Sequence, residues 1–104
     1  MPTRRERLEA MLAAEPGDQF LRYSLAMELD KEAQHERSLE LLRGLAADET
    51  PYVPAFFMAG QQLTRLSRVE EAQAVLTDGI VAARRQGNVH AEREMSEFLA
   101  GLDE

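Results

Sequence analysis

The chain has 104 residues, of which 44% are hydrophobic, and this length suits a single domain with a small core. It has no cysteine, which excludes disulfides, thiolate metal sites and cysteine nucleophiles, and we expect a cytoplasmic protein. The formal net charge of -7 argues against nucleic acid or anionic lipid as a partner, because phosphate binding requires a cationic face.

An amphipathic helix is predicted near the N-terminus, over residues 3–14. Leu8, Met11 and Leu12 recur there at helical spacing, and Pro16-Gly17 ends the pattern. Glutamates surround this weakly apolar stretch and no long apolar region follows, so we do not interpret it as a signal peptide. No run in the chain approaches the ~20 apolar residues of a membrane span.

Three arginines crowd the first turn of this helix, where the helix dipole mildly disfavours cations. They are Arg4, Arg5 and Arg7. We interpret them as solvated side chains at a frayed helix end, with a basic contact patch as the alternative.

Two further helices are predicted next. Asp18 caps the first, which runs to about Lys31, and the second spans about Gln34 to Ala47. One apolar stripe of the first helix is expected to pack against the second. This stripe consists of Leu21, Leu25, Ala26 and Leu29.

The following pair of helices carries clear start and stop signals. Pro54 suits the first turn of the earlier helix, where a missing N–H leaves no hydrogen bond unmade. Ser67 and Glu70 have the spacing of a capping box, which would start the later helix. That helix is expected to extend to about Gln86, with Gly87 as its left-handed terminator.

A last helix is predicted over residues 89–102. Its apolar side consists of Val89, Met95, Phe98, Leu99 and Leu102, and its polar side of His90, Arg93, Glu94 and Glu97. We expect the apolar side to cover the end of the preceding helices and the polar side to face water.

The segment from Phe56 to Leu76 carries a spacing of bulky, small and apolar residues that recurs in the chain. Phe56 is followed by the small pair Ala59-Gly60, then by Leu63, Ala72 and Leu76. An offset of 34 residues matches Gly60 with Ala26, Leu63 with Leu29, Ala72 with Ser38 and Leu76 with Leu42. Small residues thus match small ones, and apolar residues match apolar ones.

This pattern resembles the tetratricopeptide repeat, a helix-turn-helix unit of protein-interaction scaffolds. The resemblance implies an all-α fold of about six helices, in which antiparallel repeats stack as a short right-handed superhelix. It divides the domain into a half-repeat helix (3–16), repeat 1 (17–50), repeat 2 (51–87) and a capping helix (88–104). Two positions depart from the pattern: Arg22 stands at the bulky first position, and Pro51 falls one residue late.

By this resemblance, five small residues take the close-packing positions of the repeats: Ala26, Ser38, Gly60, Ala72 and Gly79. Antiparallel helices approach closely only where side chains are small, so Gly60 and Ala72 are expected to mark one helix crossing. Gly79 costs about 1 kcal/mol of helix propensity relative to alanine, and close packing explains its presence.

No catalytic constellation is visible, and we expect no enzyme, no metal and no cofactor. His35 neighbours Glu36, and His90 lies one turn from Glu94, but metal sites generally need three or four ligands and a second shell. Solvated side chains are therefore expected at both places. The less favoured alternative is a small enzyme or metal protein that uses His90 and Glu94, which a metal titration would test.

The helix after Asp18 has a second apolar stripe beyond the one needed for packing, made of Phe20, Tyr23 and Met27. In tetratricopeptide arrays, the extra face of the first helix of each repeat lines a concave groove that takes an extended peptide or a helix. By that resemblance, the groove here consists of Phe20, Tyr23, Met27 and Asp30 with Phe57, Gln61, Thr64 and Arg65. Aromatic and methionine side chains are common anchors at interfaces.

A protein or peptide partner with an apolar anchor is therefore expected. Chaperone-binding members of the family grip a terminal carboxylate with lysine and asparagine, whereas the matching places here hold Tyr23, Met27 and Met58. Two alternatives stay open: the terminal helices cover the apolar stripe, or the surface from Tyr23 to Phe57 forms a homodimer. We expect a monomer or weak homodimer, with neither nucleic acid nor membrane as a partner.

Overall fold

The computed structural model describes residues 1–103. These residues form six α-helices joined by short loops, and no strand. In chain order they are α1 (Arg4–Ala14), α2 (Gln19–Lys31), α3 (His35–Ala46), α4 (Val53–Arg65), α5 (Val69–Arg85) and α6 (Val89–Leu102). The all-α fold predicted from the sequence is confirmed, and the helix bounds lie close to the predicted ones.

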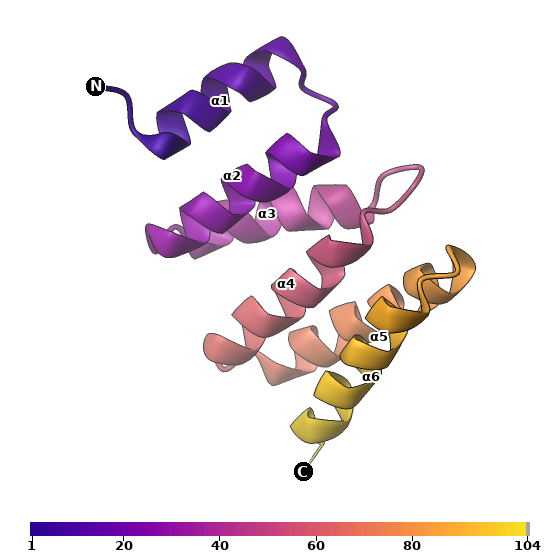
Figure 1. Cartoon of the computed structure of the whole chain (residues 1–104). Coiled ribbons are helices and arrows are strands. Elements are labelled where there is room, and N and C mark those ends of the chain that lie inside the picture. Colours follow the sequence, from indigo (N-terminus) through magenta and orange to yellow (C-terminus); the bar gives the residue numbers. More distant parts are fainter. Residues whose placement is uncertain (104) are drawn as a thin grey trace.

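Consecutive helices pack against one another and form a short helical stack (Figure 1). Each helix contacts the next one along the chain, and α6 also reaches α4. The stack measures 45 × 29 × 18 Å, and helices α1 and α6 lie at its opposite ends. Within residues 1–103, no helix combines the length and the apolar character needed to cross a membrane.

Three groups of buried side chains hold the stack together. The first lies among α2, α3, α4 and α5 and consists of Ala26, Leu39, Leu42, Leu45, Ala55, Ala59, Leu63 and Ala72. The second joins α4, α5 and α6 and consists of Val53, Phe56, Leu76, Ala82, Ala83 and Met95. The third joins α1 to α2 and consists of Leu8, Leu25 and Leu29.

The third group adds a partner to the one expected for α2. Leu25 and Leu29 were expected to pack against α3; they share their buried group with Leu8 of α1, and Leu41 of α3 packs against the same group. Because α2 lies between α1 and α3, its apolar residues divide between two neighbours, and Ala26 alone of the predicted stripe belongs to the group shared with α3.

Two glycines permit the closest approaches between helices. A Cβ atom added to Gly60 would lie 2.6 Å from Cδ2 of Leu76, and one added to Gly79 would lie 2.5 Å from Cβ of Phe56. The atoms nearest to an added Cβ at Gly60 thus belong to Leu76, one turn of α5 beyond Ala72, and Ala72 is fully buried as well. A helical side chain leans toward the turn that precedes it, so Leu76 covers the surface above Ala72.

The turns after α2 and α4 share one backbone form. Ala33 and Ser67, which lie 34 residues apart, have φ angles of 61° and 62°. After Ala33, the N–H of Gln34 donates to the carbonyl of Leu29 at 2.8 Å, and the turn at Ser67 repeats this bond at 2.8 Å. A left-handed residue with this bond is a common way to end a helix. The period seen in the sequence is therefore also present in the backbone.

This turn overturns the capping box predicted for Ser67 and Glu70. The N-cap of α5 is Arg68, and no side chain caps that helix end. Ser67 takes the left-handed conformation that ends α4, so its hydroxyl is not placed to accept from the first turn of α5. Two other predicted signals are confirmed: Asp18 accepts a backbone N–H of α2 at 2.9 Å, and Gly87 ends α5 with a φ of 71°.

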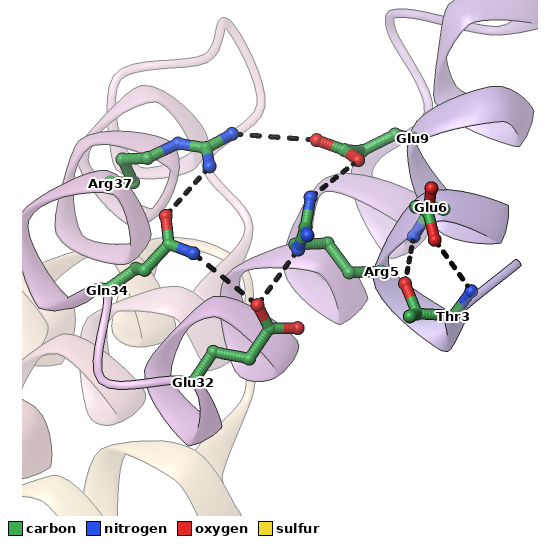
Figure 2. A network of polar contacts seen from close by, with 7 residues as sticks. All are labelled: Thr3, Arg5, Glu6, Glu9, Glu32, Gln34 and Arg37. Atoms are coloured by element: carbon green, nitrogen blue, oxygen red, sulfur yellow. Dashed lines mark hydrogen bonds and ion pairs between the residues drawn. The ribbon is translucent and has the colours of Figure 1, made fainter.

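A capping box that was not predicted starts α1 (Figure 2). The N–H of Glu6 donates to Thr3 Oγ1 at 3.1 Å, and the N–H of Thr3 donates to Glu6 Oε1 at 2.9 Å. The backbone hydrogen bond from Thr3 is the main cause that holds the pKa of Glu6 below its ordinary value. Because both ends of the box are satisfied, α1 has a well-defined start.

Two of the N-terminal arginines form ion pairs, so the prediction of a frayed and solvated end is wrong for them. Arg5 Nε lies 2.9 Å from Glu32 Oε1, and Arg5 NH1 lies 3.1 Å from Glu9 Oε1 (Figure 2). Arg4 pairs with Glu28 at 3.2 Å. Glu28 and Glu32 come from the end of α2, which the packing of α1 brings beside the first turn of α1.

Arg22 replaces the bulky residue of the repeat pattern with an ion pair. Its NH1 and NH2 atoms lie 2.6 Å and 3.2 Å from the two carboxylate oxygens of Asp48, which follows α3. Gln19 donates to the same carboxylate at 3.0 Å and to the carbonyl of Thr50 at 2.8 Å. The two paired side chains are only 17% and 27% exposed. This contact ties α2 to the loop between α3 and α4.

Arg22→Met is expected to destabilise the protein at neutral pH and to do so less in acid. The hydrogen bond from Arg22, followed by that from Gln19, lowers the pKa of Asp48 from its ordinary value of 3.8. A carboxylate with a lowered pKa in the folded state contributes stability above its unfolded pKa and loses that contribution as pH falls through the folded pKa.

Urea unfolding of wild type and Arg22→Met across the pH range measures this effect. The difference in unfolding free energy should be steady above about pH 5 and shrink below about pH 4. Arg93→Met, at an exposed position of α6, serves as the control and should show no such trend. A difference that stays constant into strong acid would contradict the role given to Asp48.

A buried chain of polar groups connects α2, α3 and α4. The hydroxyl of Ser38 donates to the carbonyl of Ala26 at 2.6 Å and accepts from Gln62 Nε2 at 2.9 Å. Ser38 is 0% exposed and Gln62 is 1% exposed. The resemblance explained Ser38 by its small size alone, whereas the structure also gives its hydroxyl two partners.

Ser38→Ala would introduce a smaller apolar side chain, yet we expect it to lower the free energy of unfolding by about 1–3 kcal/mol. The change removes the partner of two buried groups, the carbonyl of Ala26 and the amide of Gln62. Chemical denaturation checks the value. Gln62→Leu removes one of the two groups that Ser38→Ala leaves without a hydrogen-bond partner. It should therefore lower the free energy of unfolding less in the Ser38→Ala background than in wild type. A Ser38→Ala variant as stable as wild type would refute this account.

α6 packs through the predicted apolar side except at its first residue. Met95 is fully buried, and Phe98, Leu99 and Leu102 are partly buried. Val89 is 61% exposed, although it was predicted on the apolar side. It is the first residue of α6, and the turns that pack on α4 and α5 come after it.

Candidate protein-binding surface

Side chains from three helices surround a small pocket with a volume of about 250 Å³. α2 contributes Tyr23, α4 contributes Val53, Pro54, Phe57, Met58 and Gln61, and α6 with its N-cap residue contributes Asn88, His90, Ala91, Glu94 and Met95. The sides from α2 and α4 are mainly apolar, and the side from α6 carries most of the polar groups. Three of the predicted groove residues, Tyr23, Phe57 and Gln61, thus lie around one pocket.

Aromatic contacts hold the two main rings of this pocket. The ring of Tyr23 lies 5.3 Å from that of Tyr52 at an interplanar angle of 57°, and the ring of Phe57 lies 5.6 Å from that of Phe98 at 76°. Burial, followed by the proximity of Tyr52, raises the pKa of the Tyr23 phenol. Tyr23 and Phe57 are therefore partly buried side chains, and α6 covers one side of Phe57.

Phe20 and Met27 extend the apolar surface of α2 into solvent. Their side chains are 66% and 37% exposed. They share one face of α2 with Tyr23, because the three residues follow the i, i+3, i+7 spacing of a helix. Single exposed apolar residues are common on protein surfaces, but here two of them flank Tyr23, which lines the pocket.

Three of the polar residues predicted for the groove, Asp30, Thr64 and Arg65, have partners within the protein. Asp30 Oδ2 lies 3.1 Å from Arg65 NH2, and Asp30 Oδ1 lies 3.0 Å from His35 Nδ1. The hydroxyl of Thr64 donates to the carbonyl of Gly60 at 2.7 Å. The pair between Asp30 and Arg65 joins α2 to α4.

The contribution of α6 to the pocket was not predicted. His90 and Glu94 were expected on a face that only meets water, yet both line the pocket. Their side chains are 80% and 48% exposed, and His90 Nε2 lies 3.2 Å from Glu94 Oε1. Helical spacing showed that the two residues share a face of α6. It could not show that this face adjoins α4.

A larger hollow of about 990 Å³ lies on the other side of α4, between α3 and α5. Its floor includes Phe56, Ala59 and Leu63, which belong to the buried groups of the core. Its rim carries charges of both signs, and one ion pair crosses from α3 to α5, with Arg43 NH2 3.4 Å from Glu71 Oε1. None of the predicted groove residues lines this hollow, whereas Tyr23, Phe57 and Gln61 line the smaller pocket, so we favour the smaller pocket as the candidate site.

In the described part of the chain, no group of three His, Cys, Asp or Glu residues is placed to hold a metal ion. Neither histidine there therefore belongs to such a group. His35 contacts Asp30 and not its sequence neighbour Glu36. Glu36 instead pairs with Arg68, the N-cap residue of α5, at 2.6 Å. The arrangement of these residues is that of surface ion pairs.

Comparison with solved structures decides the family. A solution structure of a tetratricopeptide repeat domain protein from Salinibacter ruber matches with a TM-score of 0.78 and 30% sequence identity, over 84% of this chain and 88% of that chain. The chain belongs to the tetratricopeptide repeat family. The solution structure of a protein from Bordetella parapertussis matches with a TM-score of 0.80 and 31% identity, over 99% of this chain and 90% of that chain.

The other two comparisons add nothing to this assignment, because neither a scan of family sequence models nor a search of curated proteins finds a match. Tetratricopeptide repeat folds typically serve as interaction modules without catalytic activity. In this tetratricopeptide repeat protein, the smaller pocket lies among α2, α4 and α6.

Proposed function

We propose that the chain is a non-enzymatic interaction module that binds a peptide or a helix of a partner protein along α2 and α4. The proposed groove consists of Phe20, Tyr23, Met27, Asp30, Phe57, Gln61, Thr64 and Arg65. The observation that carries the proposal is the 250 Å³ pocket beside Tyr23 and Phe57, with the 66% exposed ring of Phe20 on the same helix face as Tyr23. An apolar side chain of the partner would enter the pocket, and its neighbours would contact α2.

We also propose the repeat division given by the resemblance, with a half-repeat at 3–16, repeats at 17–50 and 51–87, and a capping helix at 88–104. Residue 104 lies outside the described residues. The matching left-handed turns at Ala33 and Ser67 support this division, because they fall at equivalent positions of the two proposed repeats. In this division, α2 and α4 are the first helices of their repeats.

The double variant Phe20→Ala, Met27→Ala tests the groove with little effect on the fold. Both side chains are exposed, whereas Tyr23 and Phe57 also support the fold through aromatic contacts. The probe is a set of peptides selected on wild type from a phage-displayed library of random peptides. Interface anchors are commonly worth ~2 kcal/mol or more each, so we expect affinity for the selected peptides to fall at least ~10-fold, with an unchanged unfolding midpoint.

Val81→Ala provides the matched control. Val81 of α5 is 39% exposed, close to the 37% of Met27, but it lines the hollow between α3 and α5. This variant should bind the selected peptides as wild type does. Peptides that bind the Phe20, Met27 variant undiminished, or that lose affinity for the Val81 variant, would place the binding surface elsewhere.

The exposed stripe on α2 also keeps self-association as a second candidate function, because Phe20 and Met27 could be covered by another copy of the chain. Sedimentation equilibrium separates the two. A wild-type dimer that dissociates in the Phe20→Ala, Met27→Ala variant would favour the homodimer, and a monomer at all concentrations tested would remove it.

A further inference from the structure

The pocket among α2, α4 and α6 has an apolar side and an acidic side. Among the described residues that line it, Glu94 is the one carboxylate, and none is lysine or arginine. The Glu94 side chain is 48% exposed, and its Oε1 atom lies 3.2 Å from His90 Nε2. A carboxylate this exposed retains an oxygen that a ligand can reach.

The charges around this pocket reinforce the acidic side. Arg65, the predicted cation of the groove, pairs with Asp30 at 3.1 Å. Glu97 lies one turn beyond Glu94 on α6 and is exposed. The chain as a whole carries a formal charge of -7. Such a surface attracts cationic groups and disfavours anionic ones.

The size of the pocket limits what can enter it. Small-molecule sites usually have volumes of ~300–1,000 Å³, and this pocket has about 250 Å³. It therefore suits one apolar side chain of a longer ligand. A group next to that side chain would lie at the rim, where α6 presents Glu94.

We infer that the partner segment carries an arginine or lysine close to its apolar anchor and that this cation pairs with Glu94. The inference rests on the proposed function and specifies its ligand: a basic, apolar-anchored segment, with Glu94 as the residue that selects for positive charge. Acidic segments would be rejected by the same carboxylate.

The test uses the same phage-displayed random peptides, selected on wild type. We expect the recovered sequences to be enriched in arginine or lysine at a fixed distance from an apolar residue. A synthetic copy of such a peptide should bind Glu94→Gln ~2–5-fold more weakly, because a partly exposed ion pair is worth little, and Glu94→Lys at least ~10-fold more weakly. Replacing its basic residue with a neutral analogue, citrulline for arginine or norleucine for lysine, should abolish the difference between wild type and Glu94→Gln.

Arg93→Gln is the control, since it changes the charge of the neighbouring position on α6 without touching the pocket lining. It should not weaken binding. Circular dichroism and thermal unfolding establish that each variant is folded. Weaker binding at higher salt would further support an ion pair at this rim.

The outcomes separate the inference from the proposed function. Peptides that depend on Phe20 and Met27 but show no basic enrichment, or that bind Glu94→Gln and Glu94→Lys as tightly as wild type, would overturn the inference and leave the groove in place. If no peptide is recovered, or if the recovered peptides do not depend on Phe20 and Met27, the groove itself is refuted and the inference with it.

Discussion

Met95→Ala is expected to lower the free energy of unfolding by about 2–5 kcal/mol, the range for truncating a buried methionine. Met95 is 0% exposed and belongs to the group of side chains that joins α4, α5 and α6. Its sulfur packs against Gly79: a Cβ atom added to Gly79 would lie 2.6 Å from the Met95 sulfur. Truncation would leave a cavity at the point where the three helices meet, and α6 should loosen from the stack.

Urea denaturation checks this value, with Met11→Ala as the matched control. Met11 lies on α1 and is 53% exposed, so the same truncation there should change stability by less than about 0.5 kcal/mol. Hydrogen exchange should show faster exchange in α6 of the Met95 variant, because that helix depends on this contact. Similar stabilities for the two variants would mean that α6 is not packed as described.

Gly60→Leu is expected to destabilise the protein by ~1–3 kcal/mol or more through overpacking. Even a Cβ atom at Gly60 would lie 2.6 Å and 2.7 Å from Cδ2 and Cγ of Leu76. The rest of a leucine side chain would have to displace Leu76, which is 0% exposed. Because α4 and α5 cross at this point, the two helices would be forced apart.

Gly101→Leu is the control for this change. Gly101 lies near the end of α6, and a Cβ there would meet no atom within 4 Å. The substitution should leave the thermal midpoint unchanged or raise it slightly, because glycine is a poor helix former by about 1 kcal/mol relative to alanine. A Gly60→Leu variant with an unaltered midpoint would show that the helices cross elsewhere.

These variants separate the residues that hold the stack from those proposed to bind. Met95 and Gly60 are buried, so changing them alters the fold and any binding together. Phe20 and Met27 are exposed on α2, so changing them should affect binding alone. α6 contributes to both the core and the proposed binding surface, because Met95 anchors it in the core while Glu94 lines the pocket. For that reason the mild Glu94→Gln change is a better probe of binding than removal of α6.

Local sequence features determined the helices and most of their ends. Apolar residues at helical spacing, the cap at Asp18, the proline at Pro54 and the terminator at Gly87 all act within a few residues of the chain. The same is true of the repeated small and apolar positions around Gly60, because each repeat is one helix-turn-helix unit built largely from its own residues. Helix propensity, capping and periodicity are properties of neighbouring residues, so they can be recognised without the tertiary structure.

Tertiary packing decided which residues of different helices contact one another. These contacts could not be predicted from the sequence. Periodicity assigns a residue to a face of its helix but does not say which helix that face adjoins. Glu94 was therefore predicted to face only water, although α4 lies beside it. Likewise, Arg22 and Asp48 are 26 residues apart in the chain, and Arg5 and Glu32 are 27 apart. Their pairing exists only because the stack brings the ends of different helices together.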